Sequence, residues 1–123
     1  MSHFEVFKYD PGARHIPAGE VLFHEGDTAD TMFIVLEGEV DLTLDGSLID
    51  TACPGHVFGE MAMIEKGTRS STARARTDAF IVPVDRSRFL YLVQNTPHFA
   101  VDVMASMAYR LRRIHDCSIP STP

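Results

Sequence analysis

Apolar and polar positions alternate in short runs over the first two thirds of the chain, and turn-forming residues separate the runs. Short apolar stretches bounded by Gly, Pro and Asp are typical of strands rather than helices. The pattern predicts strands over Val21–His24, Met32–Leu36, Glu39–Leu44, Ser47–Thr51, Ser71–Ala75 and Ala79–Val84. Asp45 and Gly46 lie between two of them and predict a two-residue hairpin of type I′. Many short strands with such turns are typical of a sandwich or a jelly-roll barrel.

The pattern changes to a helical period after Val84. Asp85 is a suitable N-cap for a helix over Arg86–Asn95. The dipeptide Thr96-Pro97 predicts the start of a second helix, with Pro at its first position, that ends near Asp116. We therefore expect one domain over residues 1–123: a β-roll over about residues 14–85, helices over about residues 86–116, and a disordered tail over residues 117–123.

The chain has 123 residues, of which 45% are apolar and 23% charged, a balance typical of one soluble domain. Its cysteines, Cys53 and Cys117, form no CxxC pair and are typical of a reduced intracellular protein, although one disulfide is compatible with them. The first residues lack the order of a signal peptide, and the longest apolar run, Met32–Leu36, is too short to span a bilayer. We expect a cytoplasmic protein without membrane association.

Charge is divided unevenly between the two halves of the chain. Residues 1–60 carry twelve acids against two bases, whereas residues 61–123 carry nine bases against five acids, within a net charge of −6. An acidic chain argues against a general nucleic-acid binder, so no nucleic-acid partner is expected. The basic second half is compatible with one small bound anion, although solvated surface charge accounts for most of these residues.

The segment Phe58–Ala75 combines several residue types that suit a ligand site. Gly59 permits a close approach of the backbone to another group. Residues 60–64 can form one helical turn, whose first N–H groups lack internal partners and favour an anion. Arg69 follows at the start of a strand, and its forked guanidinium suits a phosphate. Because Glu60 repels phosphate but accepts hydrogen bonds from a sugar hydroxyl, the spacing predicts a nucleotide pocket, whereas each residue alone is an ordinary turn or surface residue.

Several stretches of the chain together resemble one known family. The run Phe58-Gly-Glu-Met-Ala-Met, followed by Arg69-Ser-Ser-Thr-Ala, is similar to the phosphate-binding cassette of the cyclic nucleotide-binding domain family. Residues 17–40 resemble the family's opening strands, and residues 54–59 resemble its approach to the cassette. The resemblance covers about residues 14–115. It implies a mainly β fold with α elements: a β-roll like a double-stranded jelly-roll barrel, a short cassette helix and C-terminal helices.

The resemblance also implies a role for each matching residue. Glu60 corresponds to the acid that binds the ribose 2′-hydroxyl, and Arg69 to the arginine that pairs with the cyclic phosphate. The other implied ligand-binding residues are Gly59, Met61, Ala62, Ser70 and Ser71. In the family, threonine directly after this arginine is associated with cGMP and alanine with cAMP. Ser70 leaves the choice open, with cAMP favoured.

The last helix of family members often closes over the base. By this analogy, the candidates for base contact are Tyr109, Arg112 and Arg113, since tyrosine and arginine planes stack on purines. An exposed basic helix face is the alternative for each of them. The resemblance implies a regulatory domain that binds cAMP or cGMP, with no catalytic residue, metal or further cofactor. Such a domain signals by repositioning its C-terminal helices toward a regulated protein or a second copy.

Three other functions match parts of this pattern. A transcription factor needs a helix-turn-helix after the long helix, and we expect none within residues 1–123, although a longer parent protein would reopen this alternative. A cupin-type metalloenzyme needs clustered histidine ligands, and the six histidines form no His-x-His pair. The main alternative is a structural or interaction module that keeps the fold but binds no nucleotide. Its apolar stripe, which packs on the roll or pairs with a second copy, would be Val103, Met107, Leu111 and Ile114.

Overall fold

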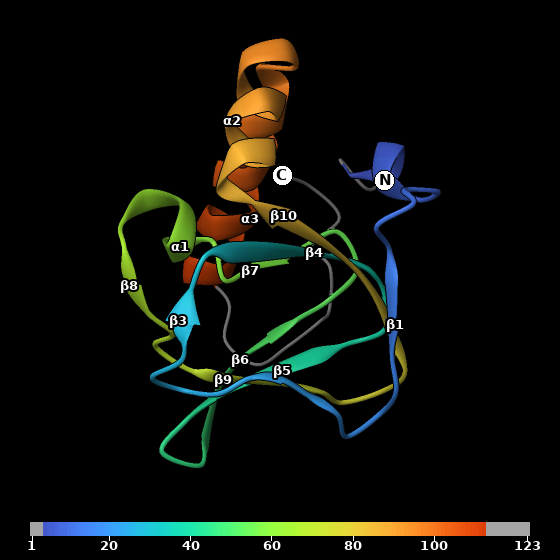
Figure 1. Ribbon diagram of the computed structural model, residues 1–123. Helices are drawn as coiled ribbons and strands as arrows, with labels where there is room; N and C mark the ends of the chain where they lie inside the picture. The colour runs from blue at the N-terminus through green and yellow to red at the C-terminus, as the bar shows by residue number, and fades with distance from the viewer. Residues whose placement is uncertain (1–3, 113–123) are drawn as a thin grey trace.

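Two four-stranded antiparallel sheets face each other and form the body of the computed structural model, which describes residues 4–112 (Figure 1). The first sheet has the order β1 (Arg14–Ile16), β10 (Ala79–Asp85), β4 (Thr31–Glu37) and β7 (Val57–Phe58). The second has the order β2 (Val21–Phe23), β9 (Thr72–Ala75), β5 (Val40–Leu44) and β6 (Ser47–Ala52). A separate ribbon pairs β3 (Thr28–Ala29) with β8 (Gly67–Thr68). The expected mainly β fold is confirmed, as two facing sheets rather than a closed barrel.

The six expected strands are all present, with bounds that differ by one or two residues from the expected ones. The expected hairpin is also present, because Asp45 and Gly46 have φ of 52° and 82° between the paired residues Leu44 and Ser47. Strands β1, β3, β7 and β8 were not expected. They have only two or three residues each, which is too short for an alternating pattern to be recognised.

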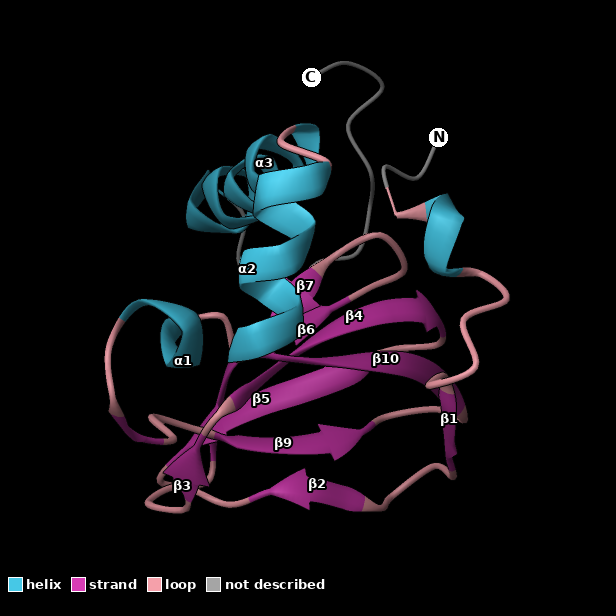
Figure 2. Ribbon diagram, turned by 45° about the horizontal axis from the view of Figure 1, so that its top comes forward, coloured by secondary structure: helices cyan, strands magenta, loops and turns pink. Residues whose placement is uncertain are grey.

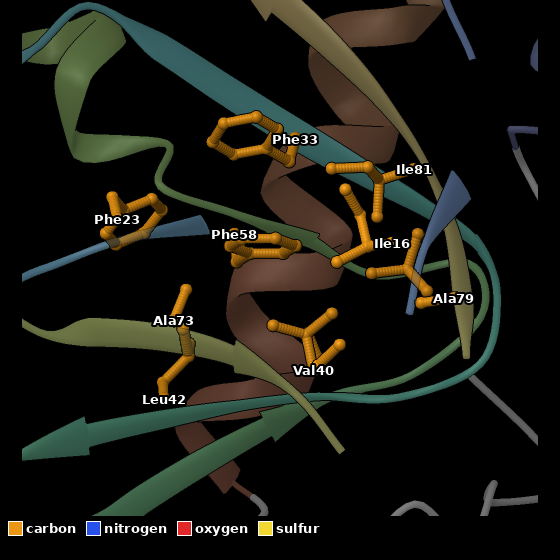
Figure 3. Packing of buried hydrophobic residues seen from close by; sticks show 12 residues of the cluster. Ile16, Phe23, Phe33, Val40, Leu42, Phe58, Ala73, Ala79 and Ile81 are labelled. Atoms are coloured by element: carbon orange, nitrogen blue, oxygen red, sulfur yellow. The ribbon is translucent and has the colours of Figure 1, made fainter. Parts of the chain in front are cut away.

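Aromatic side chains fill the space between the two sheets. Phe33 stacks on Phe58 with ring centroids 5.1 Å apart, and Phe23 lies 5.9 Å from Phe33 (Figure 3). Smaller residues such as Ala73 and Val40 complete this cluster from the second sheet. Because Phe58 is the last residue of β7, the same packing fixes the point at which the chain enters the candidate cassette.

The helices cover the outer face of the first sheet (Figure 2). Residues of β4 alternate between the two faces: Phe33 lies between the sheets, whereas Met32 and Ile34 lie under the helices. Burial on both faces explains why this strand has an unbroken apolar run. The covering elements are a short 3₁₀ helix η1 (Glu5–Phe7), α2 (Arg86–Asn95) and α3 (His98–Arg112).

Helix α2 has the expected bounds, and its N-cap is confirmed because the Asp85 side chain accepts a hydrogen bond of 2.8 Å from Arg88 N–H. Helix α3 begins at His98, so Pro97 precedes it rather than occupying its first position. Its expected end near Asp116, residue Ile114 and the tail lie outside the described residues. Of the other predicted stripe residues, Val103 is buried and Met107 packs against the core. Leu111 is 86% exposed and does not join them.

Cys53 is buried and disulfide-bonded, so the expectation of a reduced thiol is wrong for this residue. The disulfide alternative, which the sequence left open, is the one that the structure contains. No helix among residues 4–112 is long and apolar enough to cross a membrane.

An ion pair ties the N-terminal segment to α2. The two terminal nitrogens of Arg88, Nη1 and Nη2, donate to the Asp10 carboxylate, and this hydrogen bonding holds the pKa of Asp10 below its usual value of 3.8. Because the pKa of Asp10 is lower in the folded chain than in the unfolded chain, the ion pair stabilises the fold at pH values above the usual carboxyl pKa. This stabilisation is lost as the pH falls through the lowered pKa.

We therefore expect Asp10→Asn to reduce the free energy of unfolding by about 1 kcal/mol at neutral pH. Urea unfolding of both proteins across the acid range tests this expectation. The difference between them should shrink as the pH falls below the usual carboxyl pKa, and a difference that is the same at every pH would contradict the assignment.

Candidate functional site

A cavity of about 360 Å³ lies at one end of the roll, where the second sheet meets the segment after β7. Its volume is within the range of small-molecule sites. Seven of its lining residues are the ones that the sequence singled out: Gly59, Glu60, Met61, Ala62, Arg69, Ser70 and Ser71. Apolar residues also line the cavity, namely Phe23, Leu42 and Ile49. The fold thus brings the predicted phosphate and sugar contacts to one hollow.

Arg69 is a buried cation without a full set of hydrogen bonds. The residue is 8% exposed, and its Nε atom has no hydrogen-bond partner among the described residues. The guanidinium carbon lies 4.1 Å from the Phe23 ring centroid and 5.6 Å from that of Phe33. Burial lowers the pKa of Arg69, and the charges of Asp30 and Asp27 partly oppose this shift. The group remains a cation at neutral pH, since arginine pKa values are so high.

An unsatisfied buried donor costs free energy unless a partner arrives. The Arg69 guanidinium packs on aromatic rings. The main chain of the same residue is fixed by two hydrogen bonds: its backbone N–H donates to Asp27 O at 2.7 Å, and its carbonyl accepts from Gly26 N–H at 2.9 Å. A fixed, desolvated cation of this kind suits an anion with several oxygen acceptors.

Gly59 makes room for this cation. Its φ is +74°, a left-handed conformation that glycine adopts without strain. A Cβ at this position would lie 2.8 Å from Arg69 Nη1 and 3.3 Å from Thr31 O. The position therefore requires glycine for two reasons, backbone conformation and space.

The short helix α1 (Met61–Ile64) is present, as the sequence predicted. Its free amides are fewer than expected, because Ala62 N–H donates to Gly59 O and Met63 N–H to Glu60 O within the same turn. At the other end of the helix, Arg86 Nη1 donates to Met63 O at 2.7 Å and links α1 to the start of α2.

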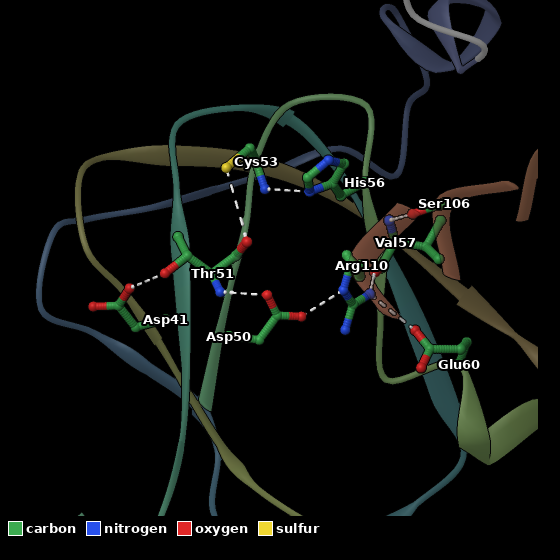
Figure 4. A network of polar contacts seen from close by, with 9 residues as sticks. All are labelled: Asp41, Asp50, Thr51, Cys53, His56, Val57, Glu60, Ser106 and Arg110. Carbon is green, nitrogen blue, oxygen red and sulfur yellow. Dashed lines mark hydrogen bonds and ion pairs between the residues drawn. The ribbon is translucent and has the colours of Figure 1, made fainter. Parts of the chain in front are cut away.

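Glu60 lies at the edge of the cavity, and its side chain is 14% exposed. It does not cap α1 through its side chain. Instead, its Oε1 lies 3.3 Å from Nη1 of Arg110, a residue of α3 that also lines the cavity (Figure 4). A carboxylate held in this way can accept a hydrogen bond from a ligand hydroxyl while it stays paired with the arginine.

Among the described residues, none of those that the sequence suggested for base contact is found in the cavity lining. Tyr109 and Arg112 are not among the residues that line the cavity: the Tyr109 ring lies 5.2 Å from that of His56, and Arg112 is exposed. Arg113 lies outside the described residues. Arg110 is the α3 residue at the cavity, and the sequence interpretation missed it. It follows the buried Val103 by seven residues, so the helical period would have identified it as a residue on the inward side.

A β-roll cavity that is lined by a carboxylate and by a buried arginine, whose Nε has no partner among the described residues, suits a small organic anion. The profile of the cyclic nucleotide-binding domain family matches residues 13–96, and this chain belongs to that family.

Related proteins extend this assignment. The chain is 34% identical over 104 residues to the cyclic AMP receptor protein of Thermus thermophilus, covering 80% of this chain and 48% of that protein. It is 35% identical over 77 residues to the cGMP-dependent protein kinase egl-4 of Caenorhabditis elegans, covering 63% and 10%. Among solved structures, the c-di-GMP responsive regulator CLP of Xanthomonas campestris has a TM-score of 0.76 at 25% identity, covering 89% and 58%. The chain spans less than half the length of the curated relatives it matches.

Proposed function

We propose that this domain is a receptor for a cyclic nucleotide, whose phosphate pairs with Arg69 and whose ribose hydroxyl binds Glu60. The observation that carries the proposal is that Arg69 lines the cavity and that its buried Nε donor has no partner among the described residues. A cyclic phosphate supplies the acceptor oxygens and the negative charge that this donor needs.

The apolar wall suits a purine. Leu42 and Ile49 line the cavity and offer the apolar contact that a base needs. Ser70 stands where threonine in the family is associated with cGMP and alanine with cAMP, so this residue leaves the choice open, and cAMP is the ligand that we favour. Relatives named for cAMP and for cGMP both match the chain, which keeps cGMP as the competing ligand.

The proposed activity is regulation by binding, without a bond made or broken. The ligand would favour one arrangement of the cassette and the C-terminal helices over another, and its differential affinity would set the size of the shift. Arg86 and Arg110 support this proposal, since they connect the cassette to α2 and to α3.

Isothermal titration of nucleotide-stripped protein with cAMP and then cGMP tests the proposal. Stripping is needed because a tightly bound ligand can co-purify and mask the site. We expect one site per chain with a dissociation constant of about 10 μM or below. The tighter of the two nucleotides identifies the ligand.

A folded sample that binds neither nucleotide would contradict the proposal and favour an interaction module. The surface for such a module differs from the one that the sequence indicated. Val101, Met104 and Leu111 are the exposed apolar residues of α3, and they share the side of the helix that faces away from the roll.

A further inference from the structure

One face of α3 docks on the segment that leads into the cassette. Ser106 and Arg110 are four residues apart and therefore share this face. The Ser106 hydroxyl accepts a hydrogen bond of 3.1 Å from Val57 N–H, and Arg110 Nη1 donates to Val57 O (Figure 4). Both backbone polar groups of Val57 are thus bonded to α3, and Gly59 follows two residues later.

A second strand holds the same arginine from the opposite side. Arg110 Nε lies 2.6 Å from Asp50 Oδ2, and the two side chains are only 14% and 17% exposed. The other Asp50 oxygen accepts Thr51 N–H at 2.8 Å, which fixes the orientation of the carboxylate. An ion pair with this burial and these additional hydrogen bonds is held more firmly than an ordinary surface pair.

Arg110 therefore contacts two acids that both line the cavity. Asp50 is at 2.6 Å and Glu60 at 3.3 Å, so the guanidinium is anchored mainly by Asp50 and reaches Glu60 from that anchor. The position of Glu60, the proposed ribose acceptor, consequently depends on where Arg110 lies. The position of Arg110 depends on Asp50 and on the docking of α3.

We propose that Asp50 is a positioning residue that couples α3 to the nucleotide site: it holds Arg110, which docks the helix on Val57 and orients the Glu60 carboxylate. This inference takes its ligand from the proposed function, but the docking of α3 on Val57 does not require a bound ligand. Docking of α3 and binding at Glu60 then favour each other, because coupling between two sites is reciprocal.

The test uses Asp50→Asn, which keeps the shape of the side chain and removes its charge. Amide hydrogen exchange without ligand reports the docking directly, because the Val57 amide is bonded to Ser106 of α3. We expect the Val57 and α3 amides to exchange roughly fivefold faster in the variant. Titration with cAMP should show a dissociation constant raised about fivefold.

Asp41→Asn is the matched control. Asp41 lies on the adjacent strand β5, pairs with Arg76 at 3.0 Å and accepts a hydrogen bond of 3.1 Å from the Thr51 hydroxyl, but it neither lines the cavity nor contacts Arg110. The control loses the same charge and an ion pair of the same type, so it should retain the exchange rates and affinity of the wild type. Urea unfolding of both variants establishes that each is folded.

Arg110→Lys provides a second variant, because lysine cannot hold Asp50, Val57 and Glu60 at once. It should reproduce both effects of Asp50→Asn, and the double variant should add little to either single one. The proposal is overturned if Asp50→Asn leaves the exchange of α3 unchanged, or if faster exchange comes with wild-type affinity. A wild type that binds no nucleotide would contradict the proposed function instead, while the ligand-free exchange still decides the docking.

Discussion

Replacement of Arg69 by glutamine is expected to weaken cyclic nucleotide binding by about 100-fold. The guanidinium is the proposed partner of the cyclic phosphate, and its Nε donor has no other partner among the described residues. Glutamine keeps a donor in the cavity but removes the charge, so the loss measures the charge-assisted part of the interaction. Titration with cAMP at constant pH and salt gives the two dissociation constants.

The ligand-free fold of the Arg69 variant should stay within about 1 kcal/mol of the wild type, because two effects oppose each other. The variant loses the contacts of the guanidinium with the Phe23 and Phe33 rings. It is also relieved of the unfavourable burial of a cation, which is the effect that lowers the pKa of Arg69. Urea unfolding without ligand measures the balance.

Arg74→Gln is the control for this experiment. Arg74 lies on β9 close to Arg69 in sequence, but it is exposed and donates to Gly19 O at 2.9 Å. Both variants lose one positive charge, so a general electrostatic effect on an anionic ligand would appear in both. Binding by the Arg69 variant at the level of the Arg74 variant would rule out the phosphate role.

Replacement of Gly59 by alanine is expected to damage both the fold and the site. The alanine would be strained at a φ of +74°, and its Cβ would lie 2.8 Å from Arg69 Nη1, which must then move. We expect a loss of about 1–3 kcal/mol in the free energy of unfolding. The displaced guanidinium should weaken nucleotide binding at least tenfold, by roughly the strength of one charge-assisted hydrogen bond.

Gly46→Ala separates the effect of backbone strain from the effect of the collision with Arg69. Gly46 has a φ of +82° in the hairpin between β5 and β6, but no atom lies within 4 Å of the position that its Cβ would take. The control therefore carries the backbone strain without the collision. Unfolding measurements should show a loss in both variants, whereas titration should show weaker binding only for Gly59→Ala. Equal affinities would mean that the space beside Arg69 does not matter for the ligand.

The residues that line the cavity were accessible to sequence reasoning because most of them belong to one continuous segment. Gly59, Glu60 and Arg69 are close in the chain, and local chemistry of turn, acid and base suggested a common site. The structure places all three at the cavity, and whether they bind a nucleotide is the subject of the titration. The N-cap at Asp85 and the hairpin at Asp45 were predictable for the same reason, since each depends on neighbours in sequence.

Contacts between distant segments could not be predicted in this way. Arg110 meets Asp50 across 60 positions of the chain and Glu60 across 50, and no local pattern specifies such a pairing. The two-residue strand β7 depends on its partner β4 and shows no periodicity of its own. The bonding of Cys53 likewise did not follow from cysteine spacing.

The sequence by itself determined the class of fold, the two helices after Val84 and the segment that lines the cavity. Each of these depends on hydrophobic period, turn chemistry or spacing within a few residues. Only the tertiary structure decided which residue of α3 reaches the cavity, namely Arg110 rather than Tyr109 or Arg112. The reason is physical: an amphipathic helix can be rotated or shifted against a sheet at small cost, and the hydrogen bonds and ion pair to Val57 and Asp50 select one position.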